Sequence, residues 1–410
     1  MDRSGVIRRL AELGHEPAAD GAGMPLFAPA SAEQAAELLG TCTREGWRVR
    51  VQGAGSRGGA ALAADLAVTT RRLTGFDIYE PDDLTVGIRA GTTHGAAAAL
   101  LARHKQLLPL DPPGTPAATL GGSFASGEAG PLRAGYGTPR DLALGITLVT
   151  ADGRLLHLGG QVVKNVAGYD LVRFVVGSRG TLGLITQLHA RLRSLPPSDV
   201  TVIAQVADGV DAAAAALRLR DAVAPVALEL LTPAATGAPW SLALRLHGSA
   251  AVTAAAQTTV TRMHPAARTL DGLAAAGFWA DLAAVEAAAP IHIRCTGLPS
   301  AVPDLLAAAA SLLNSRSDND LPAWRGAVHA TGGNLRLWPA RASHEPNGAL
   351  AAALHQLGSR VASVNGTCTC DRGPEAVRAL LPGAPAAPRV LELERELRLR
   401  FDPGAILVGA

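Results

Sequence analysis

Residues 110–183 place the strongest constraint on how this chain can fold. The stretch is rich in glycine, proline and small hydroxyl residues, and much of it has no apolar period. Glycine is used where the backbone turns through positive φ or approaches another group closely. A long surface loop would explain the composition, but long structureless loops in compact domains are usually functional. We therefore expect this stretch to shape a binding surface.

Two glycine-rich segments are candidates for that surface. The first is Gly121-Gly122 in the segment Ala-Thr-Leu-Gly-Gly-Ser, which predicts a small-residue bend with free N–H groups for a phosphate or a planar ring. Arg133 and Arg140 follow nearby and could add positive charge. The second is the loop 53–59 after a predicted strand at 48–52. This loop is not a dinucleotide fingerprint, has no following βαβ unit and lacks a Walker Lys-Ser or Lys-Thr, so a plain hairpin turn explains it equally well.

Length and charge limit the classes of protein that this chain can belong to. With 410 residues, two domains are expected. The net charge of +2 gives no electrostatic case for nucleic acid or an acidic membrane surface. We find no apolar run long enough for a transmembrane segment and no signal-peptide core near the N-terminus. These features predict a soluble, cytoplasmic protein.

The cysteines do not form a cluster-binding pattern. The chain has four, Cys42, Cys295, Cys368 and Cys370, and only the last two lie close together. An iron–sulfur cluster needs four thiolates, typically in C-x₂-C runs, and a structural zinc site needs a similar set. We therefore expect free, reduced thiols, and any iron–sulfur cluster must belong to another chain.

Periodicity predicts an α+β protein. A helix at 31–47 begins with Ser31 as N-cap, and a second helix runs from a Thr92 cap through His94 to His104, with both histidines expected on the surface. Two strands are predicted around a turn at 80–83, and the Asp-Gly pair at 152–153 predicts a hairpin. The expected strands of this first part are 48–52, 66–70, 84–91, 142–150, 155–158 and 182–192.

Pro196-Pro197 marks a predicted domain boundary. Beyond it, predicted strands alternate with alanine-rich helices, which is typical of an antiparallel sheet with helices on one face. The strands are 200–206, 226–231 and 241–246, and the helices are 211–222, 249–263 and 302–314. An amphipathic helix is predicted at 388–401. The expected division is 1–197, 198–387 and 388–410.

Four ordered motifs resemble the FAD-binding domain of the vanillyl-alcohol oxidase and p-cresol methylhydroxylase superfamily. Within it, residues 163–171 and the closing segment 401–407 are most similar to the FAD-binding subunits of bacterial glycolate oxidases. The resemblance spans nearly the whole chain. The motifs are Gly53-Ala54-Gly55-Ser56, Thr119-Leu120-Gly121-Gly122, the segment 133–141 (Arg-Ala-Gly-Tyr-Gly-Thr-Pro-Arg-Asp) and the segment 177–186 (Gly-Ser-Arg-Gly-Thr-Leu-Gly-Leu-Ile-Thr).

The resemblance implies a fold and a cofactor site. The fold would be a two-lobed p-cresol-methylhydroxylase-type FAD-binding domain over 1–197, followed by an α+β cap domain with an antiparallel sheet. FAD would be bound non-covalently, because neither glycine loop contains the His or Cys to which relatives attach flavin. The implied contacts are Gly53, Ala54, Gly55, Ser56, Thr119, Gly121, Gly122 and Ser123 around the pyrophosphate, Arg133, Gly135 and Tyr136 beside the flavin together with Asp141 of the same motif, and Gly183 and Ile185 along the adenosine half.

The chain also departs from the family where substrate chemistry is concerned. Hydroxy-acid dehydrogenases of this kind carry a His-x-Gly-Asp-Gly-Asn-x-His segment and a later Glu-His pair that bind a divalent metal. Here the first segment is 329–336, in which His329 remains but Arg336 takes the second ligand position. The Glu-His pair falls near 367–370, where there is no carboxylate and no imidazole. We therefore expect no metal site and a flavin carrier without its own substrate chemistry.

The leading hypothesis is the FAD-binding subunit of a glycolate oxidase complex, which oxidises glycolate to glyoxylate. A catalytic FAD subunit and an iron–sulfur subunit would be its partners, and the complex would attach peripherally to the inner membrane. The first alternative is a self-sufficient FAD-dependent 2-hydroxy-acid dehydrogenase with His292 or His329 as base. The second is a non-catalytic scaffold. Arg294 and Arg336 could anchor a carboxylate, but ordinary surface-strand charges are the simpler reading of both.

Overall fold

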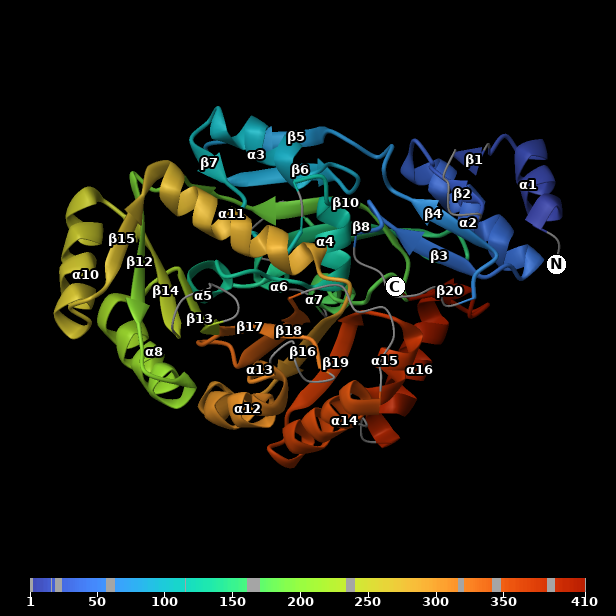
Figure 1. Ribbon diagram of the computed structural model, residues 1–410. Coiled ribbons are helices and arrows are strands. Elements are labelled where there is room, and N and C mark those ends of the chain that lie inside the picture. Colours follow the sequence, from blue (N-terminus) through green and yellow to red (C-terminus); the bar gives the residue numbers. More distant parts are fainter. Residues whose placement is uncertain are drawn as a thin grey trace.

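The structure is a computed structural model with two lobes (Figure 1). It describes residues 3–15, 17–18, 24–56, 63–114, 116–160, 170–233, 240–315, 321–340, 348–381 and 388–409. The far end of the predicted glycine loop, 57–59, and residues 163–169 of the motif after the hairpin lie outside these ranges.

The first sheet holds the N-terminal part of the chain together with its C-terminal strand. Its strand order is β1-β2-β4-β3-β20, and β2, β4, β3 and β20 pair in parallel. The helix before β3 begins as predicted, since the Ser31 side chain accepts from the backbone N–H of Gln34. Leu38, Leu39 and Val68 are among the residues of its core. The elements are α1 (Arg3–Glu12), β1 (Pro17–Ala18), β2 (Leu26–Phe27), α2 (Ala32–Glu45), β3 (Val49–Gln52), β4 (Leu66–Thr69) and β20 (Leu407–Val408).

The second sheet is antiparallel, in the order β5-β6-β10-β8-β9. Its core includes Ile88, Phe124 and Leu148. The strands are β5 (Phe76–Glu80), β6 (Thr85–Arg89), β8 (Ala143–Val149), β9 (Leu155–Gly159) and β10 (Leu184–Arg191), beside a small pair of β7 (Gln106–Leu107) and β11 (Arg193–Ser194). The helices are α3 (His94–Ala102), α4 (Leu120–Ser126), α5 (Arg133–Tyr136), α6 (Pro139–Leu142) and α7 (Leu171–Val175).

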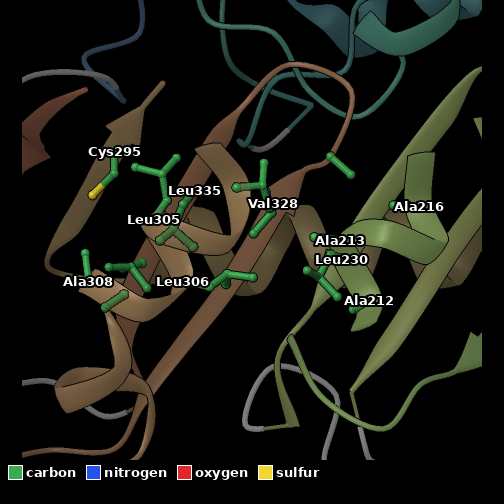
Figure 2. Close-up of a cluster of buried hydrophobic side chains, with 14 of the residues drawn as sticks. Ala212, Ala213, Ala216, Leu230, Cys295, Leu305, Leu306, Ala308, Val328 and Leu335 are labelled. Carbon is green, nitrogen blue, oxygen red and sulfur yellow. The ribbon is translucent and has the colours of Figure 1, made fainter. Parts of the chain in front are cut away.

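The third sheet forms the second lobe, and its described part has eight antiparallel strands in the order β15-β12-β14-β13-β17-β18-β16-β19. Its outer face packs on helices through a core that includes Ala212, Leu230, Leu305 and Leu335 (Figure 2). The strands are β12 (Ser198–Gln205), β13 (Ala227–Leu231), β14 (Ser241–Gly248), β15 (Arg268–Asp271), β16 (His292–Thr296), β17 (Trp324–His329), β18 (Asn334–Pro339) and β19 (Thr367–Arg372). The helices are α8 (Gly209–Val223), α10 (Ala250–Met263), α11 (Gly272–Ala288), α12 (Val302–Ala308), α13 (Ala310–Leu313), α14 (Gly348–Ser363) and α15 (Glu375–Leu380), with a 3₁₀ turn at Pro299–Ala301.

The prediction of helices on one face of this sheet is wrong for α11. Trp279 of α11 packs in a separate cluster with Ile203, Ala243 and Trp338, on the face opposite to α8, α12 and α14 (Figure 1). The predicted helix 302–314 is also interrupted, as α12 ends at Ala308 and α13 begins at Ala310. The α+β class and the antiparallel sheet are confirmed.

Three local predictions in the first lobe are corrected. The turn at 80–83 joins β5 to β6, whereas the predicted partner strand 66–70 is β4 of the other sheet. The cap of α3 is Thr93, whose side chain accepts from the Ala96 N–H, because the Thr92 hydroxyl bonds to the backbone of Gly75. Gly121-Gly122 is no bend, since both residues lie in the first turn of α4.

The C-terminal segment returns to the first lobe. Helix α16 (Pro388–Phe401) is formed as predicted, but its side chains are exposed except that of Phe401. The Phe401 ring lies 6.0 Å from the ring of Phe174, and β20 then pairs with β3. Two buried backbone N–H groups, of Ile406 and Leu407, donate to the fully buried carboxylate of Asp402 and fix this return.

Candidate functional site

An open cleft lies between the glycine-rich loops of the first lobe and the edge of the second. The walls are Val51, Gln52, Gly53, Ala54, Gly55, Ser56, Thr70, Thr119, Gly121, Gly122, Ala125, Ser126, Glu128, Arg179, Gly180, Gly183, Leu184, Ile185, His292, Asp371 and Arg372.

The loop after β3 forms one wall and is fixed by its own carbonyl groups. The Thr69 hydroxyl donates to the Gly53 carbonyl at 2.7 Å, and the Arg71 guanidinium donates to the Ala54 carbonyl at 2.8 Å. A Cβ on Gly53 would lie 2.0 Å from the Thr119 hydroxyl oxygen. Only glycine therefore allows this loop to lie against the start of α4.

The start of α4 is built differently from the predicted phosphate-binding bend. The Gly121 N–H donates to the Ala90 carbonyl at 2.8 Å, and the Gly122 N–H to the Thr119 side chain at 3.3 Å. These N–H groups are thus already engaged. Gly121 instead allows close packing, because a Cβ there would lie 2.6 Å from that of Ala90.

The residue after this glycine pair points away from the cleft. Ser123 is fully buried, and its hydroxyl lies 2.7 Å from the Nε2 atom of His94. His94 is therefore a half-buried partner of α4 rather than the predicted surface histidine.

The segment before β10 supplies the third wall. Gly183 has a φ of 150°, and a Cβ there would lie 2.4 Å from the Val149 carbonyl oxygen. Ile185 follows it in β10, and both line the cleft. The predicted adenosine-side residues thus lie together with the two glycine loops.

The motif at 133–141 lies outside the cleft lining and joins the two lobes. The Gly135 N–H donates to the Val226 carbonyl at 3.0 Å, and the Tyr136 hydroxyl lies 2.8 Å from the Nδ1 atom of His247. Asp141 caps α6, where its bond from the Thr138 N–H keeps the pKa of its carboxyl low. Arg133 is half-buried, and its pKa is lowered by this burial and by the charge of Arg336.

The second lobe contributes three charged residues that sequence reasoning did not assign to the cleft: His292, Asp371 and Arg372. Asp371 accepts a bond of 2.9 Å from Arg179 of the first lobe and one of the same length from Arg294. Asp371 directly follows Cys370, so the expectation of no carboxylate near 367–370 missed it by one residue. Its position at the end of β19, next to the start of β16, brings it to His292.

His292 is held between two carboxylates. Its Nε2 atom lies 2.8 Å from Glu286, and its Nδ1 atom lies 3.7 Å from Asp371. Burial by itself would lower the pKa of His292, but these two carboxylates outweigh it and raise the pKa to about 9. The same ion pairs hold the pKa of Asp371 below its usual range despite its burial.

Behind this wall lies a buried ion network centred on Arg336. Its guanidinium donates to Glu286 at 2.7 Å and to Glu229 at 3.1 Å. Glu229 also bonds to the Nδ1 atom of His329. Although burial raises the pKa of a carboxyl, Arg336 and His292 lower that of Glu286 to about 2. With 4% exposure, Arg336 is not the surface-strand charge that the sequence suggested.

The remaining polar and sulfur groups give no sign of a metal centre. No group of three or more His, Cys, Asp or Glu side chains is arranged to hold a metal within the described ranges. All four cysteines are free thiols, and the Sγ atoms of Cys295 and Cys368 lie 3.3 Å apart in the core.

Comparison with known proteins assigns the first lobe. Residues 25–159 match the family described as FAD binding domain. The match covers 135 of the 410 residues of the chain. The matched range contains thirteen of the cleft-lining residues, from Val51 to Glu128, as well as the close approach of Gly53 to Thr119. FAD is thus the cofactor that the domain supports.

Two curated relatives match the chain over part of their length. Glycolate oxidase subunit GlcE of Escherichia coli (strain K12) is 41% identical over 125 residues, which is 30% of this chain and 36% of that protein. Glycolate oxidase subunit GlcD of Bacillus subtilis (strain 168) is 26% identical over 211 residues, which is 50% of this chain and 45% of that protein. The matches therefore span less than half of either relative.

Solved structures extend the likeness to the whole fold. A chitooligosaccharide oxidase superposes with a TM-score of 0.70 over 99% of this chain and 98% of its own, at 14% identity. The predicted fold class, a two-lobed p-cresol-methylhydroxylase-type FAD-binding domain followed by an α+β cap domain with an antiparallel sheet, is thus confirmed. In the described part of the chain, no helix has the length and apolar character needed to cross a bilayer.

Proposed function

We propose that this chain is the FAD-binding subunit of a glycolate oxidase complex and that it holds flavin without oxidising the hydroxy acid itself. The FAD-binding domain and the two glycolate oxidase relatives support the first part. The arrangement around Arg336 supports the second. In this proposal, residues 1–197 bind FAD, residues 198–387 cover it as a cap domain, and residues 388–410 form a C-terminal helix and tail.

The residues of the cleft fit non-covalent FAD. Gly53 and Gly183 line the cleft, and a Cβ on either residue would collide with neighbouring protein atoms, Thr119 and Val149 respectively. The loop 53–56 would face the pyrophosphate, with Gly122 beside it. Cysteine is missing from the described lining, and the two ring nitrogens of its histidine, His292, already face carboxylates. When bound, FAD supplies the hydride acceptor of a hydroxy-acid oxidation.

The single observation that carries the proposal is the position of Arg336. The guanidinium is buried and bound by Glu229 and Glu286, so it is not free to hold a substrate carboxylate. His292 cannot accept a proton near neutral pH, because its carboxylate partners keep it protonated. Hydroxyl oxidation needs a base or a metal while the flavin takes the hydride. In this proposal that base stands on the catalytic FAD subunit.

Electrons would leave through an iron–sulfur subunit, since this chain lacks the cysteine pattern for a cluster. The proposed partners are therefore the catalytic FAD subunit and the iron–sulfur subunit, and the substrate is a small 2-hydroxy acid. The complex would work in the cytoplasm, attached peripherally to the inner membrane.

One observation favours a second candidate, a self-sufficient 2-hydroxy-acid dehydrogenase with His329 as base. Its Nδ1 atom bonds to Glu229, while its buried Nε2 atom has no hydrogen-bond partner. Burial, aided by Arg336, lowers the pKa of His329, so the ring is neutral at pH 7. A neutral imidazole with a free nitrogen can accept a proton. His329 does not line the cleft, however, which is why we rank this candidate second.

The test is reconstitution of the complex from its separate subunits. Glycolate-dependent dye reduction is measured for the partner subunits with wild-type chain, without it, and with a His329→Gln variant. The carrier proposal predicts that omission abolishes or strongly lowers activity, whereas His329→Gln keeps it near the wild-type level. Full activity without the chain would refute a functional subunit, and loss of activity in His329→Gln protein that still binds FAD would favour the second candidate.

A further inference from the structure

His292 occupies an unusual place in the cleft wall. It is 4% exposed and begins β16, at the edge where the second lobe meets the glycine loops. Each of its ring nitrogens faces a carboxylate, Glu286 on one side and Asp371 on the other. A neutral imidazole can donate from only one nitrogen, so this environment selects the doubly protonated, charged ring.

The charges around His292 do not cancel. Asp371 is shared with Arg179 and Arg294, and Glu286 is shared with Arg336, which also binds Glu229. With the charged ring included, the cluster has four cations and three carboxylates. It therefore carries one positive charge in excess, and the two other charged residues of the cleft lining, Arg372 and Glu128, offset each other.

Resting on the proposed function, we propose that the flavin ring of FAD bound in this cleft lies beside His292 and that the positive charge of this residue raises the reduction potential of the cofactor. The residue would not exchange protons with substrate. It would act through its fixed charge, with Glu286 and Asp371 as the positioning residues that keep the ring charged and immobile.

The physical argument is one of charge in a poorly solvated place. Reduction adds negative charge to the flavin ring system, and charge near the ring is one of the means by which proteins tune its electronics. A cation that is buried is screened much less by salt than one on the surface. Reduced FAD should therefore bind more tightly than oxidised FAD, which is equivalent to a higher potential. A higher potential makes electron transfer to the flavin of such a carrier thermodynamically more favourable.

The primary test compares midpoint potentials of the FAD-bound chain. His292→Gln keeps a polar side chain of similar size but removes the charge, and His355→Gln is the control, because His355 is exposed on α14 of the second lobe and lies outside the cleft lining. In His292→Gln, we expect the ratio of the affinities for reduced and oxidised FAD to be at least tenfold lower than in the wild-type chain. This corresponds to a fall in midpoint potential of about 30 mV or more for a two-electron couple. The control should stay at the wild-type value.

Two results would overturn the inference while leaving the proposed function intact. The first is an unchanged potential in His292→Gln, and the second is an equal loss of affinity for oxidised and reduced FAD, which would place the residue against the pyrophosphate. Wild-type chain that binds no FAD would instead refute the proposed function itself, so the two failures are distinguishable.

A pH titration of the wild-type chain tests the same inference without relying on the folding of a variant. The charged groups around His292 are Glu286 from α11, Asp371 and Arg372 from β19, Arg294 from its own strand, Arg336 from β18 and Arg179 from the first lobe. Only His292 among them should titrate near pH 9. We expect an additional fall of the potential above that pH, and a profile without it would contradict the inference. Glu286→Gln, which removes one of the two positioning carboxylates, should move the fall to lower pH.

Discussion

Replacement of Gly53 by alanine tests whether the cleft wall formed by the loop after β3 depends on the contact of this loop with the start of α4. The new Cβ would lie 2.0 Å from the Thr119 hydroxyl oxygen, 3.2 Å from its Cβ and 3.5 Å from its Cγ2. The hydroxyl must therefore move. Its movement would also break the cap bond to the Gly122 N–H.

The size of the effect follows from these two terms. Overpacking in a closed contact costs roughly 1–3 kcal/mol, and loss of a threonine cap costs about 1 kcal/mol. We expect Gly53→Ala to lower the free energy of unfolding by roughly 2–4 kcal/mol and to weaken FAD binding. Thr119→Ala should cost only about 1 kcal/mol, because it removes the cap and leaves no collision.

The double variant isolates the collision. With Thr119→Ala in place, the nearest atom to the new Cβ is the residue 119 Cβ at 3.2 Å, so a small adjustment should suffice. The double variant should then be little less stable than Thr119→Ala alone, which gives a coupling energy of roughly 2–4 kcal/mol. Urea unfolding followed by circular dichroism measures all three variants. Additive losses, or a neutral Gly53→Ala, would refute the reasoning.

Three further predictions concern the buried charges and thiols. Arg336→Met leaves Glu229 and Glu286 without their guanidinium and should destabilise the fold by roughly 3–5 kcal/mol in urea unfolding, so an unchanged midpoint would contradict the network. The pKa of His292 is about 9 in the folded chain and about 6.5 in the unfolded chain, so its contribution to stability is complete below pH 6.5 and is lost as pH rises through about 9. The free energy of unfolding should fall over this window by up to roughly 3 kcal/mol. His292→Gln should abolish this pH dependence. The Cys295–Cys368 thiol pair should resist iodoacetamide in the folded chain at pH 8, because the hydrogen bond between the two thiols and their burial raise the pKa of Cys295 well above its usual value. Fast labelling of either cysteine would contradict this packing.

Local patterns in the sequence were sufficient to locate the cofactor-binding lobe. The strand 48–52, the Ser31 cap and the Asp-Gly hairpin depend on neighbouring residues, and each was predicted close to its observed position. The glycine motifs also lie together, because 53–56, the start of α4 and the segment before β10 are adjacent in the fold. The parallel pairing of β20 with β3 depends on residues more than 350 positions apart and was not predicted.

The charged wall of the site could not be read from local patterns. His292 and Asp371 are separated by 79 positions and meet only because β16 and β19 are neighbours in the third sheet. The hydrogen bond of the Gly121 N–H could not be predicted either, since its acceptor, the Ala90 carbonyl, lies on a different segment. Gly135 and Tyr136 were recognised by their motif, but the structure uses them where α5 meets the second lobe.

The most direct test of the account is an anaerobic absorbance spectrum of the purified chain before and after addition of glycolate. The account predicts a flavin band that denaturation releases as free FAD and that glycolate does not bleach, with bleaching restored when the proposed partner subunits are added. Immediate bleaching by glycolate in the isolated chain would contradict the central claim, because it would place the substrate chemistry in this chain. Folded protein that shows no flavin band, even after added FAD, would contradict it at the earlier step of cofactor binding.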